Sequence, residues 1–250
     1  MRFTNKVVMI TGGAQGIGAA AARAFMAEGA AAAIADIDLP RAEALVAELA
    51  AEGGRALAVR CDVADPASTV EAASRIADAL GGIDLLINGA ALHNFTYGQP
   101  TLKLGIDKWR AMLNVNVIGI VNCVAAVREA MAARGGGVIV NMSSINSFVN
   151  LSAYGVSKLA VRGLTTAMAT ELAPENIRVL GIAPGMMDTE STLAELPEVH
   201  QRALIDTLQL IKRQGRREDV VNAMLFFCSD QASFITGETL IVGGGYPLRI

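Results

Sequence analysis

The stretch VVMITGGAQGIG at residues 7–18 decides the fold of this 250-residue chain. Val7–Ile10 form a short apolar run of the kind found in buried strands, and an alanine-rich, helix-forming segment follows Gly18. Between them, Gly12 and Gly16 permit a tight turn and a close approach of the backbone to a ligand, while free amides at a helix start attract phosphate. The stretch therefore predicts a pyrophosphate-binding turn between a strand and a helix, with a purely structural turn as the alternative.

The rest of the chain repeats the alternation of short apolar runs with longer helix-forming segments. Runs with little polar alternation are typical of parallel strands that are buried on both faces, and crossovers of this length form βαβ units. No linker or internal repeat divides the chain, so we predict one domain spanning residues 1–250, with an α/β fold in which a doubly wound parallel sheet lies between two helical layers. The expected strands are Val7–Ile10, Ala31–Ala35, Leu57–Val59, Leu85–Ile87, Val138–Asn141, Val179–Ile182 and Leu240–Val242.

A segment at about residues 186–210 interrupts this alternation, because it is long and helix-like and lies between a strand end and the next regular unit. It is either a mobile lid over a substrate or an ordinary pair of surface helices. Its apolar residues recur at near-helical spacing, which suits the wall of an apolar pocket and suits core packing equally. These residues are Leu193, Leu196, Val199, Leu204, Ile205 and Leu208.

Composition narrows the classes of partner. A net charge of −3 and a pI near 5.5 leave no basic excess for nucleic acid or anionic lipid, so we expect neither. Three cysteines without paired spacing and only two histidines predict no metal site. The start of the chain lacks the features of a signal peptide, and the apolar run Val115–Val127 is too short to span a bilayer. We therefore expect a cytoplasmic protein without a membrane partner.

Asp36 indicates which dinucleotide the turn would bind. It closes the second apolar run, 18 residues beyond Gly18, where a carboxylate can accept hydrogen bonds from both hydroxyls of an adenosine ribose. A carboxylate also repels a ribose 2′-phosphate, and neither Gln15 nor Ile37 offers the compensating positive charge. The sequence therefore predicts NAD rather than NADP as cofactor, with a helix cap as the alternative role of Asp36.

Two later strand ends fit the same crevice. Asp62 and Val63 follow the third run, where they could meet the adenine, and the segment Asn88-Gly89-Ala90 follows the fourth, where it could line the ribose. Taken alone, these are ordinary loop residues.

Tyr154 and Lys158 are four residues apart in a helix-forming segment and so share one helix face. A phenol that acts at neutral pH needs its pKa lowered by about 3, and a nearby ammonium and an oxidised nicotinamide both supply positive charge. A serine hydroxyl after the fifth strand could bind the substrate oxygen, and we choose Ser144 over Ser143. An exposed helix pair is the alternative for a lone Tyr-x-x-x-Lys.

In the order and spacing of these motifs the chain resembles the short-chain dehydrogenase/reductase family from about Lys6 to Gly245. The matching features are Thr11-Gly12-x-x-x-Gly16-Ile17-Gly18, Asp62-Val63, Asn88-Gly89-Ala90, Val115-Asn116-Val117, Ser144, Tyr154-x-x-x-Lys158 and Pro184-Gly185. Ser144 precedes Tyr154 by ten residues, where the family usually has about a dozen or more, so the loop between them must be tighter and Ser143 stays an alternative.

The resemblance implies a Rossmann-type fold, a nicotinamide cofactor and a homotetramer. It implies Tyr154 as general acid/base, Ser144 as ligand of the substrate oxygen, Lys158 as ribose ligand and charge source, and Asn116 as a relay that holds water. It places Thr189 at the nicotinamide carboxamide, although Thr189 could equally cap a helix. The predicted cofactor-binding residues are Gly12, Gln15, Gly16, Ile17, Gly18, Asp36, Asp62, Val63, Asn88, Ala90, Tyr154, Lys158, Pro184, Gly185 and Thr189.

The predicted activity is the NAD-dependent interconversion of a secondary alcohol and a ketone. The substrate would be held by the region His93–Tyr97, the loop Ile145–Leu151 and the lid, and a medium-sized, largely apolar alcohol is the expectation. Phe95 and Tyr97 could form a binding wall or an oligomer contact. Two other functions stay open: a non-catalytic NAD-binding sensor or scaffold, and a 3-oxoacyl-thioester reductase, which would favour NADP and a basic docking patch.

Overall fold

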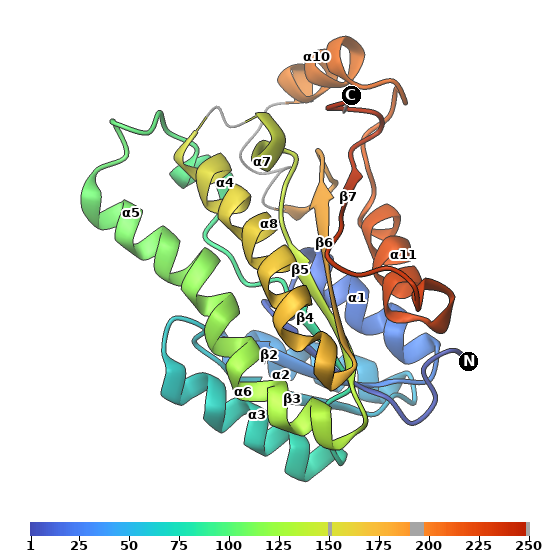
Figure 1. Ribbon diagram of the computed structural model, residues 1–250. Coiled ribbons are helices and arrows are strands. Elements are labelled where there is room, and N and C mark those ends of the chain that lie inside the picture. The colour runs from blue at the N-terminus through green and yellow to red at the C-terminus, as the bar shows by residue number, and fades with distance from the viewer. Residues whose placement is uncertain (150–151, 191–197, 249–250) are drawn as a thin grey trace.

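A computed structural model describes residues 1–149, 152–190 and 198–248 of the chain (Figure 1). Seven parallel strands form one sheet in the order β3-β2-β1-β4-β5-β6-β7. Every apolar run that we expected to be a strand lies within one of them. The strands are β1 (Val7–Thr11), β2 (Ala31–Asp36), β3 (Ala56–Arg60), β4 (Leu85–Asn88), β5 (Gly137–Met142), β6 (Ile177–Pro184) and β7 (Thr239–Val242).

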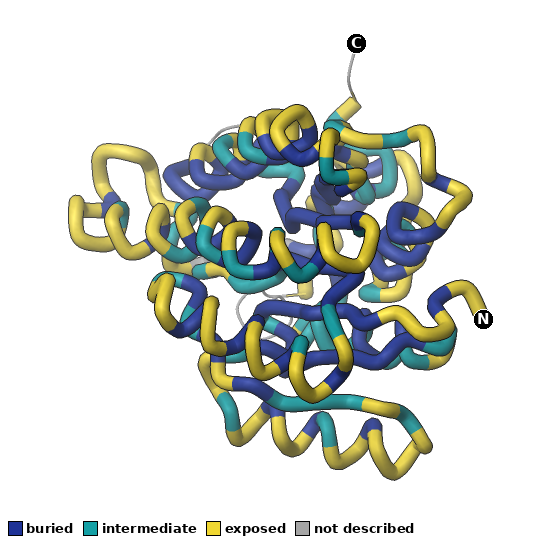
Figure 2. The backbone as a smooth tube through the Cα atoms, turned by 60° about the horizontal axis from the view of Figure 1, so that its bottom comes forward, coloured by how far each residue is buried: buried dark blue, intermediate teal, exposed yellow. Residues whose placement is uncertain are grey.

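Helices cover both faces of the sheet, which confirms the three-layer architecture. One apolar core lies between the sheet and α1, α2 and α11, and a second lies between the opposite face and α3, α6 and α8 (Figure 1). The helices are α1 (Gly16–Ala27), α2 (Leu39–Ala51), α3 (Pro66–Leu80), α4 (Asn94–Tyr97), α5 (Ile106–Leu113), α6 (Gly119–Ala133), α7 (Asn146–Val149), α8 (Ala153–Leu172), α10 (Glu198–Leu208) and α11 (Arg217–Cys228). The strands β1, β2, β4, β5 and β6 are largely buried, whereas the edge strands β3 and β7 are partly exposed and the outer helix faces are exposed (Figure 2).

Local sequence sets where the helices begin. The Asp38 side chain accepts a hydrogen bond from the Arg41 amide at the start of α2, and Asp65 accepts one from Ala67 at the start of α3. Proline occupies the first turn of both helices, where its missing amide costs nothing. Asp38, rather than Asp36, is thus the cap of α2, and Asp36 is left facing the crevice.

The strand order reverses between β1 and β4, which are neighbours although two strands separate them in the chain. In an open α/β sheet the crevice at the carboxyl ends of such strands is where ligands bind. The Thr11 hydroxyl, at the end of β1, accepts hydrogen bonds from the amides of Gly89 and Ala90 beyond β4 at 3.2 and 3.3 Å. These bonds fix the two sides of the crevice relative to each other.

α5 and α6 are joined by a π-helical turn, Asn114–Ile118, into one helix of 28 residues, Ile106–Ala133. By length and composition alone, with a mean hydropathy of 1.6 over an 18-residue window, this helix could cross a membrane. Its α6 part packs against α3, β4 and β5, and its buried side chains belong to the second core. In this fold it therefore acts as a layer helix over the sheet.

Part of the predicted lid forms α10, which lies beyond the carboxyl ends of β6 and β7 (Figure 1). Ile205 is buried against the protein, whereas Val199 is exposed, so the apolar spacing there marks a packing face on one side only. Leu193 and Leu196 lie outside the described residues. Whether the segment moves stays a prediction.

Candidate active site

A cavity of about 760 Å³ opens at the carboxyl ends of the strands, at the position where the strand order reverses. Its walls come from the glycine turn before α1, the ends of β2 to β6, the first turn of α8, and α10. All the residues predicted to bind cofactor line it except Asn88.

The glycine turn can bind a ligand because side chains cannot occupy it. Gly12 and Gly16 have φ angles of +64° and +54°, in the left-handed region that favours glycine. A Cβ on Gly18 would lie 2.3 Å from the Gly12 carbonyl oxygen, so the helix start and the turn approach more closely than any side chain allows. Gln15 caps α1 without a side-chain hydrogen bond. The turn thus presents backbone amides at a helix N-terminus, a geometry that fits a pyrophosphate.

Asp36 lies at the end of β2, in the wall of the cavity. One carboxylate oxygen accepts a hydrogen bond from the Ala14 amide at 3.0 Å and the other from the Asp38 amide at 3.1 Å. Each oxygen has further lone pairs for ligand hydroxyls. Among the described residues, the only lysine or arginine that lines the cavity is Lys158 of α8, so no cationic side chain lines the wall next to Asp36.

The ends of β3 and β4 contribute differently to the cavity wall. Asp62 and Val63 line the cavity, and Asp62 is fixed by hydrogen bonds with Ala64 and Ser68. Asn88 is 3% exposed and lies beneath the cavity, where its side-chain amide donates to the Asn141 side chain at 2.8 Å. The wall above it is formed by Gly89 and Ala90. The side chain of an asparagine at a strand end can point into the cavity or away from it, and the sequence alone did not show which.

Pro184, Gly185 and Thr189 form the wall that faces the glycine turn. A Cβ on Gly16 would lie 4.0 Å from the Thr189 methyl group, so the two walls nearly meet there. Glu190, the next residue, forms ion pairs with Arg41 of α2 at 3.3 Å and Arg217 of α11 at 3.7 Å. These pairs link the segment after β6 to α2 and α11.

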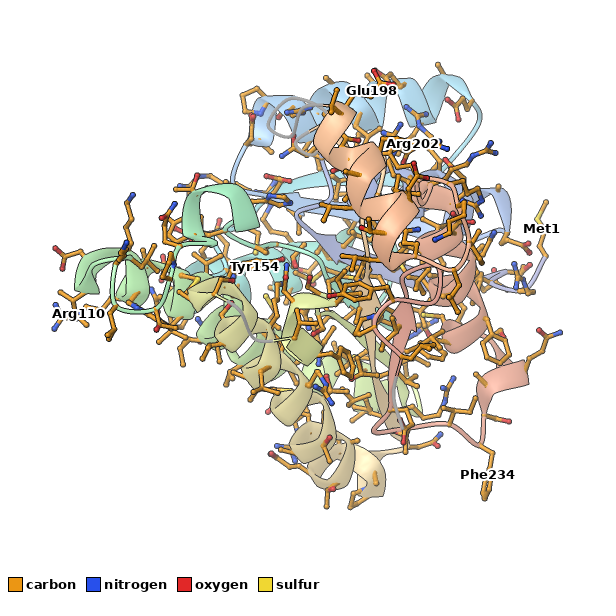
Figure 3. The ribbon with its side chains drawn as sticks, turned by 90° about the horizontal axis from the view of Figure 1, so that it is seen from above. Met1, Arg110, Tyr154, Glu198, Arg202 and Phe234 are labelled. Carbon is orange, nitrogen blue, oxygen red and sulfur yellow. The ribbon has the colours of Figure 1, made fainter. Side chains whose placement is uncertain are left out.

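Tyr154 and Lys158 lie on the first turns of α8 and are 7% and 3% exposed. Figure 3 shows Tyr154 within the body of the molecule, whereas Arg110 and Phe234 project from its surface. The Lys158 ammonium lies 5.7 Å from the centre of the Tyr154 ring and donates a hydrogen bond to the Met142 carbonyl at 2.8 Å. The Ser144 side chain lies close enough to the Tyr154 phenol to lower its pKa.

The adjacent serines both line the cavity but contact different partners. The Ser143 hydroxyl is turned toward α8, where it bonds the Lys158 carbonyl at 3.0 Å and the Ser147 hydroxyl at 3.1 Å. The short helix α7 makes the connection to α8 compact, as the ten-residue spacing requires. Of the two serines, the geometry therefore brings Ser144 to the phenol.

Burial shifts the pKa values of both catalytic candidates toward their neutral forms. It raises the pKa of Tyr154 above its usual value, because the phenolate loses its hydration and the nearby Ser144 side chain compensates only partly. It lowers the pKa of Lys158 from 10.5 to about 8. The sequence predicted a lowered pKa for the phenol, so the protein groups alone act in the opposite direction.

Asn116 lies in the π-helical turn and is fully buried, outside the cavity wall. Its side chain bonds both the amide and the carbonyl of Leu92, at 2.8 and 3.2 Å, and donates to the Ser157 hydroxyl at 3.2 Å. Ser157 in turn donates to the Tyr154 carbonyl at 2.8 Å. Asn116 thus connects the loop beyond β4 with the first turn of α8.

The other end of the cavity is largely apolar, and most of its wall lies in the segments predicted to hold substrate, whereas sequence reasoning missed Tyr246. The wall there includes Ile145, Val149, Met186, Met187, Leu204, Leu208, Gln209 and Tyr246. His93 also lines it, with its ring centre 6.4 Å from that of Tyr154. Phe95 falls among residues whose side chains are not described. No cluster of metal-ligating side chains occurs in the described part of the chain.

Comparison with known proteins agrees with this geometry. A family model described as enoyl-(acyl carrier protein) reductase matches residues 12–247. An uncharacterized oxidoreductase of Mycobacterium tuberculosis is 40% identical over 247 residues, which are 99% of each chain. Dehydrogenase/reductase SDR family member 4 of Rattus norvegicus is 36% identical over 251 residues, covering 99% of this chain and 89% of the relative.

Two solved structures are also similar to the chain. One is a 7α-hydroxysteroid dehydrogenase complexed with NADH and 7-oxo glycochenodeoxycholic acid, with a TM-score of 0.91 and 31% identity over 98% of this chain and 95% of that one. The other is a short-chain type dehydrogenase/reductase from Mycobacterium ulcerans, with a TM-score of 0.90 and 30% identity over 98% of this chain and 90% of that one.

Proposed function

The chain is a member of the short-chain dehydrogenase/reductase family of oxidoreductases with a Rossmann-type nicotinamide-nucleotide fold, and on this basis we propose that it interconverts a secondary alcohol and a ketone with NAD. The observation that carries the proposal is the Tyr154 phenol, which meets the Ser144 side chain in a cavity whose other end is the glycine turn. A proton-transfer group and a dinucleotide cradle thus share one crevice.

In the direction of oxidation, Ser144 and Tyr154 bind the hydroxyl of the alcohol, and Tyr154 as phenolate takes its proton. An oxidised nicotinamide bound beside them would accept the hydride from the carbinol carbon and add positive charge that lowers the pKa of the phenol. Lys158, four residues along α8, adds a second positive charge and holds the nicotinamide ribose. Asn116 and ordered water return the proton to the solvent.

The preference for NAD is supported by Asp36. Its carboxylate faces the cavity, the Ala14 amide fixes its position, and it has no arginine or lysine beside it in the described wall. A ribose with free hydroxyls would gain two charge-assisted hydrogen bonds there, whereas a 2′-phosphate would meet a like charge.

The apolar end of the cavity supports an uncharged substrate of medium size. Met186, Met187, Leu204 and Leu208 offer flexible or branched apolar surfaces, and His93 offers one polar group near the phenol. A largely apolar secondary alcohol, or the matching ketone, fits this chemistry.

We test the function with two measurements on the purified protein: titration with NADH and NADPH followed by cofactor fluorescence, and a screen of secondary alcohols with NAD at the reduced-nicotinamide absorbance band. Tighter binding of NADH together with turnover of at least one alcohol is expected. Binding of NADH without turnover on any alcohol would favour the non-catalytic sensor, and tighter binding of NADPH would favour the thioester reductase.

A homotetramer and a cytoplasmic location complete the proposal. Exposed apolar side chains on the long helix and on α8 supply surfaces for self-association, among them Ile118, Val121, Val156 and Leu159. Cys61, Cys123 and Cys228 are free thiols, as a reducing compartment would keep them. A sedimentation measurement that finds only a 26.0 kDa monomer at micromolar concentration would remove the tetramer.

A further inference from the structure

Two cysteines meet at the adenine end of the proposed cofactor site. Cys61 directly follows β3 and is 3% exposed, and it lines the cavity next to Asp62. Cys123 lies on α6 and is fully buried. Both side chains belong to the second apolar core, where the Cys123 thiol is close enough to Cys61 to lower its pKa. One member of the pair is thus reachable from the cavity, and the other lies directly behind it.

The contact between the two segments is tight and specific. The Asn122 side chain donates a hydrogen bond to the Val63 carbonyl at 2.9 Å. A Cβ on Gly119 would lie 2.7 Å from a Val63 methyl carbon, so the helix and the strand end touch at the backbone of α6. Gly119 and Cys123 are four residues apart and share the helix face that packs on this strand end. This packing brings the part of α6 that carries Cys123 next to the strand end that carries Cys61.

The proximity of the two thiols gives them different reactivities. It lowers the pKa of Cys61, assisted by the positive charge of Arg60 and opposed by burial and by the charges of Asp62 and Asp36. The same proximity, together with burial, raises the pKa of Cys123 well above its usual value. Because the thiolate is the nucleophile, Cys61 is the attacking sulfur and Cys123 keeps its proton as the resolving thiol.

We propose that Cys61 and Cys123 form a modification site at the adenine end of the crevice, where hydrogen peroxide oxidises them to a disulfide that blocks the cofactor. The Cys61 thiolate attacks one peroxide oxygen, the O–O bond breaks, and the hydroxide released takes up a proton to become water. The Cys123 sulfur then attacks the resulting sulfenic acid, an S–S bond forms, and the S–O bond breaks to release a second water. Two thiols lose two electrons, and one peroxide is reduced to two waters.

A disulfide at this place acts on the cofactor site through the cavity wall. Bonding distance is shorter than the contact of two thiols, so oxidation draws Cys61, and with it Asp62, toward α6. By linkage, a cofactor that binds the reduced form more tightly must favour the reduced form at equilibrium by the same factor, and a cofactor that covers Cys61 also slows the oxidation because it shields the thiolate from peroxide. This consequence rests on the proposed binding of an adenine dinucleotide, whereas formation of the disulfide does not.

The experiment treats the intact protein with hydrogen peroxide, with and without saturating NADH, and maps cysteine states by peptide mass spectrometry. We expect one disulfide that joins the Cys61 and Cys123 peptides, formed at least 10-fold more slowly with NADH, while Cys228 stays a thiol. Cys228 is a suitable internal control because burial raises its pKa to about 12. The oxidised protein should bind NADH at least 10-fold more weakly, and dithiothreitol should restore the affinity.

Two variants make the assignment specific. Cys123→Ser should leave Cys61 as a sulfenic acid that dimedone traps, without the disulfide, and Cys228→Ser should behave as the parent protein does. Absence of the Cys61–Cys123 disulfide in the parent protein, or unchanged NADH affinity once it has formed, would overturn the inference. Reduced protein that binds no NADH but still forms the disulfide would instead refute the proposed cofactor site and leave the thiol chemistry standing.

Discussion

Asp36→Asn tests the assignment of the ribose site most sharply, because asparagine keeps one acceptor oxygen while it removes the charge. That oxygen can still accept the Ala14 amide, which Asp36 bonds at 3.0 Å, so the glycine turn should keep its shape. The variant loses the bond from the Asp38 amide but keeps the bond from the Ala14 amide, and it therefore separates the charge of Asp36 from its contact with the glycine turn.

The magnitude follows from the two roles of the carboxylate. Hydrogen bonds to a charged group contribute about 1.5–3 kcal/mol each, so losing one charge-assisted ribose bond costs about 2 kcal/mol, or roughly 30-fold in NADH affinity. A unit charge about 4 Å from a phosphate charge costs about 4 kcal/mol at an effective dielectric constant near 20, and solvent at the cavity mouth reduces this to about 2 kcal/mol. NADPH should therefore gain roughly 30-fold, and the preference should change by about 10³-fold.

The assay is fluorescence titration of each protein with NADH and NADPH at one salt concentration. Asp38→Asn is the matched control, since it removes an equal charge two residues away, from a carboxylate that caps α2 and does not line the cavity. We expect the control to change the NADH/NADPH ratio by less than about 3-fold. An unchanged ratio in Asp36→Asn, or a parent protein that prefers NADPH, would refute the reasoning.

Three further changes test other parts of the site. Lys158→Met should abolish turnover yet raise the Tm of the cofactor-free protein at pH 7 by about 5 °C. The variant avoids the cost of burying the charged lysine, which a pKa lowered to about 8 puts at about 3 kcal/mol, and it loses about 1 kcal/mol with the hydrogen bond to Met142. Between about pH 8 and 10.5 the unfolded chain binds more protons than the folded protein, so the stability of the parent protein rises with pH and the difference in Tm between variant and parent should shrink. Calorimetry at several pH values that finds a constant difference would contradict this. Ser144→Ala should lower kcat by about 10²-fold, whereas Ser143→Ala should mainly lower the free energy of unfolding, by about 1 kcal/mol. Steady-state kinetics and denaturant unfolding of both variants test this, and a larger loss of kcat in Ser143→Ala than in Ser144→Ala would contradict it. Gly18→Ala should abolish NADH binding in titrations, because its Cβ would lie 2.3 Å from the Gly12 carbonyl, while Gly163→Ala, at an open position of α8, should bind NADH normally.

The parts of the site that the sequence could predict are those that depend on the spacing of residues close together in the chain. The glycine turn, Asp36 at the end of β2, and Tyr154 four residues before Lys158 each depend on one strand end or one helix face, and the structure places all of them in the cavity wall. The seven strands were predictable for the same reason, since buried parallel strands are continuous apolar runs.

The parts that sequence could not predict depend on orientation or on contacts distant in the chain. Ser143 and Ser144 are neighbours, and which one faces Tyr154 depends on how the chain turns into α7 after β5. Asn88 points beneath the cavity because Asn141, on the neighbouring strand, receives its hydrogen bond. The apolar wall adds Tyr246, near the C-terminus, to the predicted segments after β6 and on α10, and no local pattern connects Tyr246 to them.

Comparison of the parent protein with Tyr154→Phe tests the central claim most directly. In the same samples, NADH binding is titrated by fluorescence, and turnover of NAD is measured with the best alcohol from the screen. The account predicts unchanged NADH affinity and a loss of turnover on the order of 10³-fold, because phenylalanine keeps the packing but removes the proton-transfer oxygen. Turnover within about 10-fold of the parent would show that the proton leaves by another group and would contradict the account.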